Sequence, residues 1–169
     1  MSRARGVRAK TMLASAVVLA VTLSSFVVSS SAGTGSRQCL GRKATILGTS
    51  GNDNIYGTNG SDVVVGGKGE DQIHGLGGDD FMCGEGGRDI LTGGSGDDAL
   101  SGGHGGDAIF GGSGDDFLNG GTQADELDGG SGDDDMQGGF VNNYPNDSCD
   151  GGDGIYAARS DCDSALYVP

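Results

Sequence analysis

The chain has 169 residues, of which 37 are Gly and none is Trp, and it carries a formal net charge of −14. So much Gly excludes a conventional large packed core, and the negative charge argues against nucleic-acid binding, because phosphates would be repelled. A Gly-rich chain without a period is usually disordered, so the spacing of the Gly residues decides the class of protein.

Residues 1–32 have the features of a secretory signal peptide. Basic residues precede an apolar run over residues 12–28, and the small residues Ser30 and Ala32 suit cleavage after Ala32. The run is long for a signal peptide, so an uncleaved membrane anchor is the alternative. We therefore expect a secreted, extracellular protein that has no membrane span after signal cleavage.

Residues 48–137 divide into ten consecutive nine-residue units without a gap. They read GTSGNDNIY, GTNGSDVVV, GGKGEDQIH, GLGGDDFMC, GEGGRDILT, GGSGDDALS, GGHGGDAIF, GGSGDDFLN, GGTQADELD and GGSGDDDMQ. The first position is always Gly, the eighth is always apolar, and the fourth is Gly except at Gln123. The sixth position is always Asp: Asp53, Asp62, Asp71, Asp80, Asp89, Asp98, Asp107, Asp116, Asp125 and Asp134.

Each position in this unit has a physical reason. Gly at the first, second and fourth positions lets the backbone turn tightly and direct carbonyl groups inward. The last three residues are expected to form a short strand whose middle side chain points into the core. A turn lined with carbonyl and carboxylate oxygens suits Ca²⁺, which takes about six to eight oxygen ligands and tolerates irregular geometry.

The unit resembles the RTX, or haemolysin-type, calcium-binding repeat, G-G-x-G-x-D-x-U-x with U apolar. The resemblance implies an all-β fold, a right-handed parallel β-roll with two repeats per coil. It also implies that calcium binds between turns stacked on the same edge, with a contact to each sixth-position Asp and up to about eight ions in all. The flanks, CLGRKATIL and the segment from Cys149, are similar to those of short secreted members of this family.

The hexapeptide GGSGDD recurs at Gly93, Gly111 and Gly129, a spacing of two repeats that agrees with two repeats per coil. We call the turns of the even-numbered repeats the even edge and those of the odd-numbered repeats the odd edge. On the even edge, four fifth-position residues are also acidic: Asp79, Asp97, Asp115 and Asp133. We hypothesise that the even edge binds calcium more tightly than the odd edge.

Both flanks of the repeats are expected to be caps. Residues 33–47 are the N-terminal lead-in, and within it residues 39–47 read as a degenerate repeat with Ile46 at the apolar position. Residues 138–169 read as degenerate repeats and a C-terminal cap. An inserted loop precedes Asp147, which is either one further ligand or none.

Four Cys remain after signal cleavage, which suggests two disulfides in an exported protein. Three pairings are open, and the pairing of nearest neighbours is Cys39–Cys83 with Cys149–Cys162. A zinc site is a weaker alternative, because there is no C-x-x-C pair and both His lie elsewhere.

The leading hypothesis is a non-enzymatic, secreted calcium-binding protein with a structural, adhesive or interaction role and an unidentified cell-surface or protein partner. Regular recurrence of Asp indicates metal ligands rather than a catalytic carboxylate pair. The alternative is the calcium-dependent tail module of a toxin or exoenzyme without its catalytic domain, which the short flanks could not house. Ice binding is disfavoured, because only Thr49 and Thr58 align in adjacent repeats.

Overall fold

The computed structural model describes residues 37–139, 147–152, 157–158 and 164–166, and in these residues it contains strands and turns but no helix. The predicted signal peptide lies outside the described residues. No described segment forms a helix long and apolar enough to cross a membrane.

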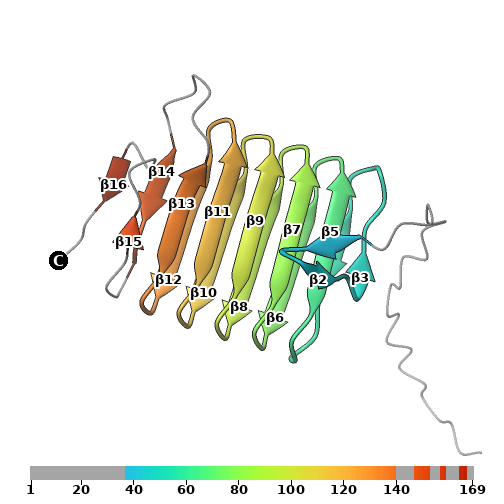
Figure 1. Cartoon of the computed structure of the whole chain (residues 1–169), viewed down its shortest axis with the longest axis horizontal. Coiled ribbons are helices and arrows are strands. Elements are labelled where there is room, and N and C mark those ends of the chain that lie inside the picture. Colours follow the sequence, from blue (N-terminus) through green and yellow to red (C-terminus); the bar gives the residue numbers. More distant parts are fainter. Residues whose placement is uncertain (1–36, 140–146, 153–156, 159–163, 167–169) are drawn as a thin grey trace, which may run out of the picture.

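The strands form two parallel sheets of seven that face each other (Figure 1). The front sheet contains β3 (Ile46–Leu47), β5 (Val63–Lys68), β7 (Phe81–Gly86), β9 (Ala99–His104), β11 (Phe117–Thr122), β13 (Asp135–Gly139) and β15 (Ala157–Ala158). The back sheet contains β4 (Asn54–Tyr56), β6 (Gln72–Gly77), β8 (Ile90–Ser95), β10 (Ala108–Ser113), β12 (Glu126–Ser131), β14 (Ser148–Asp150) and β16 (Ser164–Leu166). Successive strands alternate between the sheets, so the chain winds as a solenoid.

The register confirms the prediction of two repeats per coil. From β3 to β14, each strand pairs in parallel with the strand two places further along the chain, so that Leu100 lies beside Leu118 and Leu118 beside Met136. The three GGSGDD turns therefore stack, with Ser95 beside Ser113 and Ser113 beside Ser131. The predicted parallel β-roll is confirmed.

The strands are longer than the sequence pattern predicted. We expected strands of three residues, but β6 to β12 each span 6 residues and run into the first three positions of the following repeat. Coil-to-coil pairing continues there, for example between Gly103 and Gly121. Glycine stacked on glycine lets neighbouring coils approach closely enough for this pairing.

The core is a single narrow stack of eighth-position side chains between the two sheets. Its members in the ten repeats are at most 6% exposed: Ile55, Val64, Ile73, Met82, Leu91, Leu100, Ile109, Leu118, Leu127 and Met136. Cys149 extends the stack at one end, and Ile46 packs against it at the other. Each coil of two repeats contributes only two side chains, so little apolar burial is available per residue.

The lead-in departs from the repeat before Ile46. An antiparallel hairpin of β1 (Gln38–Cys39) and β2 (Arg42–Lys43) lies against the outer face of the front sheet (Figure 1). The predicted disulfide Cys39–Cys83 is confirmed and fastens this hairpin to β7. The Arg42 guanidinium also lies 3.9 Å from the centre of the Phe81 ring.

The structure describes only one of the two Cys residues of the predicted C-terminal disulfide. Cys149 is fully buried and disulfide-bonded. Its predicted partner, Cys162, lies outside the described residues.

Gln123 occupies a position where the backbone favours Gly. Its φ is 85°, in the left-handed region, where Gly69, Gly87 and Gly105 stand in the other turns of the same edge. We predict that Gln123→Gly stabilises the calcium-loaded roll by about 1 kcal/mol, because only Gly adopts this conformation without strain. Thermal unfolding in saturating calcium measures this. Gln123→Ala is the control, since Ala retains the Cβ and should give no gain; an equal gain for Ala would contradict the prediction.

Candidate metal centres

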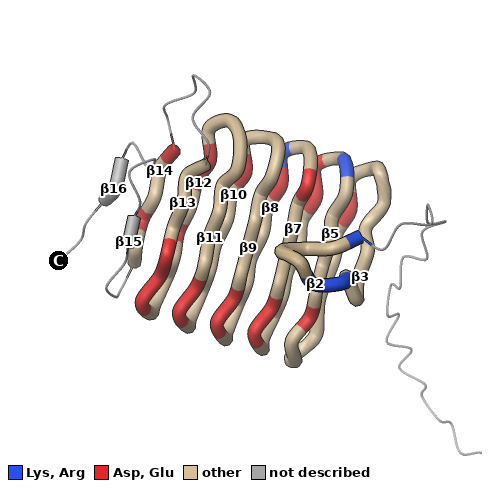
Figure 2. Tube along the Cα trace, in the orientation of Figure 1, with Lys and Arg blue, Asp and Glu red and all other residues tan. Residues whose placement is uncertain are grey.

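The stacked turns place the sixth-position Asp residues in one row along each edge of the roll. In Figure 2 the acidic segments recur at the lower edge, which is the even edge, and again at the upper, odd edge. These carboxylates are buried: from Asp71 to Asp134 none is more than 3% exposed. Buried carboxylates require compensation by hydrogen bonds or by a cation.

One oxygen of each carboxylate forms a ladder between coils. On the even edge the Asp80 backbone N–H donates to Oδ1 of Asp98 at 2.8 Å, and the Asp98 N–H donates to Oδ1 of Asp116 at 2.8 Å. The same bond repeats along both edges at 2.8–2.9 Å. The ladder fixes each side chain so that its second oxygen faces a defined direction.

The second oxygen, Oδ2, has no hydrogen-bond partner in eight of these residues. They are Asp71, Asp80, Asp89, Asp98, Asp107, Asp116, Asp125 and Asp134. Native proteins rarely leave buried acceptors unsatisfied, and each such group costs about 1–3 kcal/mol, more when it is charged. Eight orphaned carboxylate oxygens in two regular rows indicate sites for cations.

Seven of the eight orphaned Oδ2 atoms, those from Asp71 to Asp125, each face a carbonyl oxygen of the next coil across the Cα of a first-position Gly. A Cβ placed on Gly75 would collide both with Oδ2 of Asp80 and with the carbonyl oxygen of Gly93. Gly93 has the same relation to Asp98 and to Gly111. The invariant first-position Gly therefore leaves open a space that oxygen atoms of two successive turns line.

This donor set fits calcium. Carboxylate and backbone carbonyl oxygens are hard ligands of the kind Ca²⁺ prefers, whereas zinc favours nitrogen and sulfur. The described residues contain no group of three or more His, Cys, Asp or Glu side chains that could hold a metal by side chains alone. His74 stacks on Tyr56 with ring centres 4.9 Å apart, and Nδ1 of His104 lies 3.0 Å from Oγ1 of Thr122, so the two His do not form a common site.

Burial raises the pKa of these carboxyl groups. Desolvation is the main cause, and neighbouring carboxylates add to it for most members of the rows, including Asp98 and Asp116. The pKa rises to about 6 for Asp89, Asp98 and Asp107 and to about 7 for Asp116 and Asp125. Without a cation, the negative charge is therefore poorly stabilised in the roll.

The first turn of each edge differs from the others. Oδ2 of Asp53 accepts bonds from the Thr49 N–H at 2.7 Å and the Thr49 hydroxyl at 2.9 Å. Asp62 and Thr58 repeat both bonds with the same lengths. Asp53 and Asp62 lie at the ends of the two rows as predicted, but their Oδ2 atoms are already satisfied within the turn.

Asp147 continues the odd-edge row beyond the ten repeats. Its Oδ1 accepts a bond from the Asp125 N–H at 2.9 Å, and a Cβ on Gly138 would lie 2.5 Å from its Oδ2. The sequence alone did not decide whether Asp147 is a ligand, because residues 140–146 interrupt the nine-residue period. The start of an eleventh repeat at Gly138-Gly139 was the signal that pointed to it.

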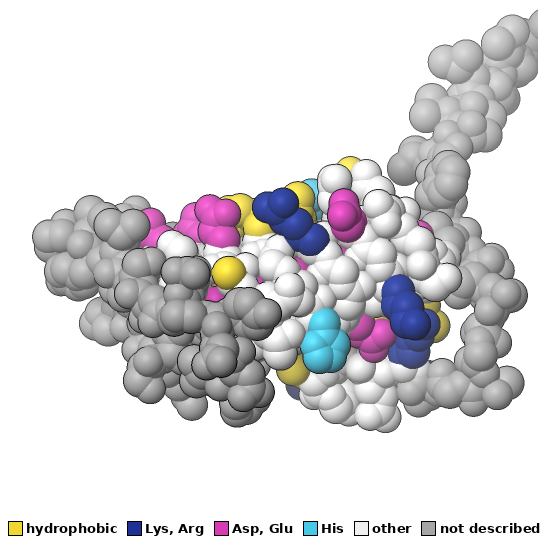
Figure 3. Space-filling view, turned by 90° about the horizontal axis from the view of Figure 1, so that it is seen from above, with side chains coloured by type: hydrophobic (Ala, Val, Ile, Leu, Met, Phe, Trp, Pro, Cys, Tyr) yellow, Lys and Arg dark blue, Asp and Glu magenta, His cyan; other side chains and the backbone are white. Residues whose placement is uncertain are grey.

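The two edges carry different charges outside the buried rows. On the even edge, the Asp97 N–H donates to Oδ1 of Asp79 and the Asp115 N–H to Oδ1 of Asp97, so exposed carboxylates form a second row. On the odd edge, burial raises the pKa of Asp107 to about 6, and the nearby Arg88 only partly opposes this increase. Figure 3, which looks onto the upper edge, shows acidic, basic and His side chains intermixed there.

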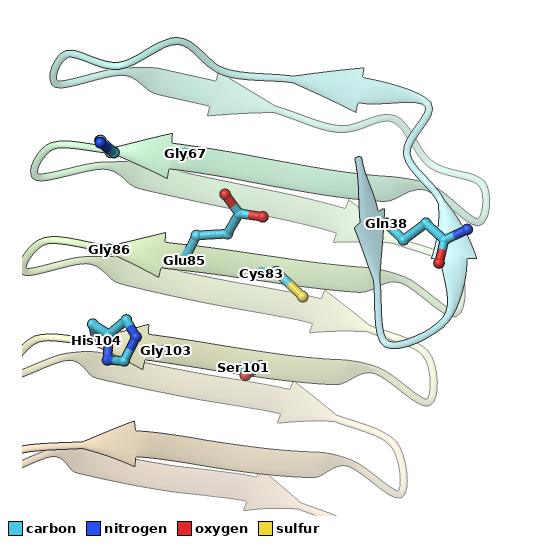
Figure 4. A pocket seen from close by; sticks show the side chains of 9 residues that line it. Gln38, Gly67, Cys83, Glu85, Gly86, Ser101, Gly103 and His104 are labelled. Carbon is cyan, nitrogen blue, oxygen red and sulfur yellow. The ribbon is translucent and has the colours of Figure 1, made fainter. Parts of the chain in front are cut away.

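A hollow on the outer face of the front sheet lies beside the N-terminal hairpin (Figure 4). Its polar lining side chains are Gln38, Lys68, Glu85, Ser101 and His104. Most of the remaining lining is Gly, and the hollow is separate from the buried Asp rows.

Comparison with known families agrees with this geometry. The family model of the RTX calcium-binding nonapeptide repeat matches residues 47–82, 83–118 and 110–145, which together span more than half of the chain. The chain belongs to this family and is a calcium-binding repeat protein. Comparison with curated proteins and with solved structures gave no match.

We predict that Gly93→Ala removes calcium binding at one inter-coil space, because the new Cβ would occupy the position between Oδ2 of Asp98 and the Gly111 carbonyl oxygen. The bound calcium per chain, measured by equilibrium dialysis, should fall by at least one ion. Gly86→Ala is the matched control: its φ is not left-handed and the nearest atom to its Cβ would be 3.9 Å away. Equal counts for the two variants would contradict the assignment of the site.

We also predict that acid makes the roll less dependent on calcium. The pKa values of about 6 to 7 in the metal-free roll lie above the ordinary 3.8, so protonation favours that roll below pH 3.8, and this contribution is lost as the pH rises through 6 to 7. In chelator, the folded fraction should therefore rise as the pH falls from 8 to 5, with a gain in the folding equilibrium of up to about tenfold per pH unit for each carboxyl group that takes up a proton. Circular dichroism in chelator between pH 8 and pH 5 measures this, and a spectrum that does not change with pH would contradict the raised pKa of the buried rows.

Proposed function

We propose that this chain is a secreted, non-enzymatic calcium-binding protein whose roll folds when Ca²⁺ binds between its stacked turns. The orphaned Oδ2 atoms in the two buried rows carry the proposal. Since seven of the eight face a carbonyl oxygen of the next coil, an ion at such a position would join two coils as well as satisfy a carboxylate.

Electrostatics supports the dependence of folding on the metal. Neighbouring coils lie about 4.8 Å apart, and ionised carboxylates at that spacing repel by roughly 1 kcal/mol per pair even in water. The repulsion is larger where the side chains are buried, as they are in both rows. A divalent cation between the carboxylates converts this repulsion into attraction, which the narrow apolar core cannot supply alone.

The environment outside the cell supplies that cation. Extracellular calcium modules typically bind Ca²⁺ at about 10⁻⁴–10⁻³ M. A chain with such sites would stay unfolded inside a low-calcium cell and fold after export. The predicted signal peptide at residues 1–32 and the disulfide Cys39–Cys83 are both consistent with an oxidising, extracellular location.

A structural, adhesive or interaction role for the folded roll follows from this proposal. The acidic residues of the buried rows repeat along each edge with the period of the coil, as structural ligands do. An isolated catalytic site would break that regularity.

Circular dichroism of the disulfide-intact protein tests the proposal. In chelator we expect the spectrum of a largely disordered chain, and in millimolar calcium a β-rich spectrum, with magnesium unable to substitute. An unchanged, β-rich spectrum in chelator would overturn calcium-dependent folding.

Two matched variants sharpen the same titration. Asp98→Asn and Asp107→Asn each keep the Oδ1 acceptor of the ladder but remove one buried charge, on the even and the odd edge respectively. Both should raise the calcium concentration needed for folding. The hypothesis of a tighter even edge requires the larger effect for Asp98→Asn, and the reverse order would reject it.

A further inference from the structure

The first turn of each edge has a different backbone from all the turns that follow it. In repeats 3 to 10 the second- and fourth-position residues have positive φ values, for example 121° at both Gly94 and Gly96. Thr49 and Gly51, and likewise Thr58 and Gly60, are outside the left-handed region. The two turns that have Thr at the second position, Thr49 and Thr58, therefore form a second class of turn within one repeat array.

The Thr side chain closes its own turn. The Thr58 hydroxyl donates to Oδ2 of Asp62 at 2.9 Å and accepts from the Gly60 N–H at 3.1 Å, while the Thr58 N–H donates to the same Oδ2 at 2.7 Å. Thr49 makes the equivalent three contacts with its own turn. In both turns, two donors from the chain satisfy the carboxylate oxygen that is orphaned elsewhere.

A side chain at the second position is not sufficient to produce this turn. Leu76 and Glu85 also stand at that position, but their φ values of 79° and 73° are left-handed. The Oδ2 atoms of Asp80 and Asp89 in their turns have no hydrogen-bond partner. The difference therefore depends on the Thr hydroxyl and the backbone that accompanies it.

Stacking explains why the Thr turns come first on each edge. From the third repeat onward, the turn of the preceding coil approaches the second position: a Cβ on Gly94 would collide with the Leu76 carbonyl oxygen. No repeat turn precedes Thr49 or Thr58 on their edges, since residues 37–47 form the hairpin and β3. At Thr49 and Thr58, therefore, no preceding turn of the repeat array limits the backbone from that side.

We propose that the hydrogen bonds of Thr49 and Thr58 to Asp53 and Asp62 prevent calcium from binding in the first inter-coil space of each edge. Hydroxyl groups then stabilise the N-terminal coil in place of metal ions. This inference rests on the proposed function, because it assigns which turns of the array take ions. Calcium then binds from the turns of Asp71 and Asp80 onward, and the roll has a metal-independent end beneath the hairpin that Cys39–Cys83 fastens.

Counting bound ions by native mass spectrometry tests the proposal. In saturating calcium, Thr49→Gly and Thr58→Gly should each bind one more ion than the unmodified protein, and the double variant two more. Thr58→Ser is the matched control, because Ser retains the hydroxyl and should leave the count unchanged. An unchanged count in both Gly variants would overturn the proposal.

A second pair of variants keeps the test decisive if a Thr→Gly variant does not fold. Asp62→Asn should leave the number of bound ions unchanged, whereas Asp98→Asn should lower it by at least one. An equal loss for both would overturn the role of Thr58. Failure of the proposed function is distinguishable, because the unmodified protein would then keep its β-rich spectrum in chelator, whatever number of ions it binds.

Discussion

The architecture depends on the encounter between a buried Asp oxygen of one coil and a Gly carbonyl oxygen of the next. From Asp71 to Asp134, hydrogen bonds hold Oδ1 of each row member, as in the bond from Asp80 to Asp98, and leave Oδ2 with no partner. Oxygen atoms that converge in this way repel one another until a cation lies between them. The apolar stack has only two side chains per coil, and the proposed function follows from this: a narrow core that cannot offset the repulsion alone would make folding depend on the bound cation.

Much of this arrangement could be predicted from the sequence because the repeat has no gaps. Once each position recurs every nine residues, the roles of Gly, Asp and the apolar residue follow from backbone geometry and ligand chemistry. The spacing of the GGSGDD segments indicated two repeats per coil, and the pairing of Ser95, Ser113 and Ser131 confirms it. The disulfide Cys39–Cys83 was predicted from proximity in sequence and is also confirmed.

Other features could not be predicted, because they depend on the neighbours of a residue in space. Thr49 and Thr58 stand at a variable position, and their bonds to Asp53 and Asp62 depend on a backbone that only the first turn of each edge adopts. Strand length was underestimated because pairing continues through stacked Gly residues. The hairpin at Gln38–Lys43 has no repeat pattern to reveal it, and the insertion at 140–146 hid the register of Asp147.

The position of calcium between successive turns, in contact with the buried Oδ2 atoms, can be measured directly. Anomalous diffraction from crystals grown in calcium locates the ions. We predict peaks between turns, such as one that contacts both Asp98 Oδ2 and the Gly111 carbonyl oxygen. Peaks confined to the exposed row of Asp97 and Asp115, with the buried spaces empty, would contradict this prediction.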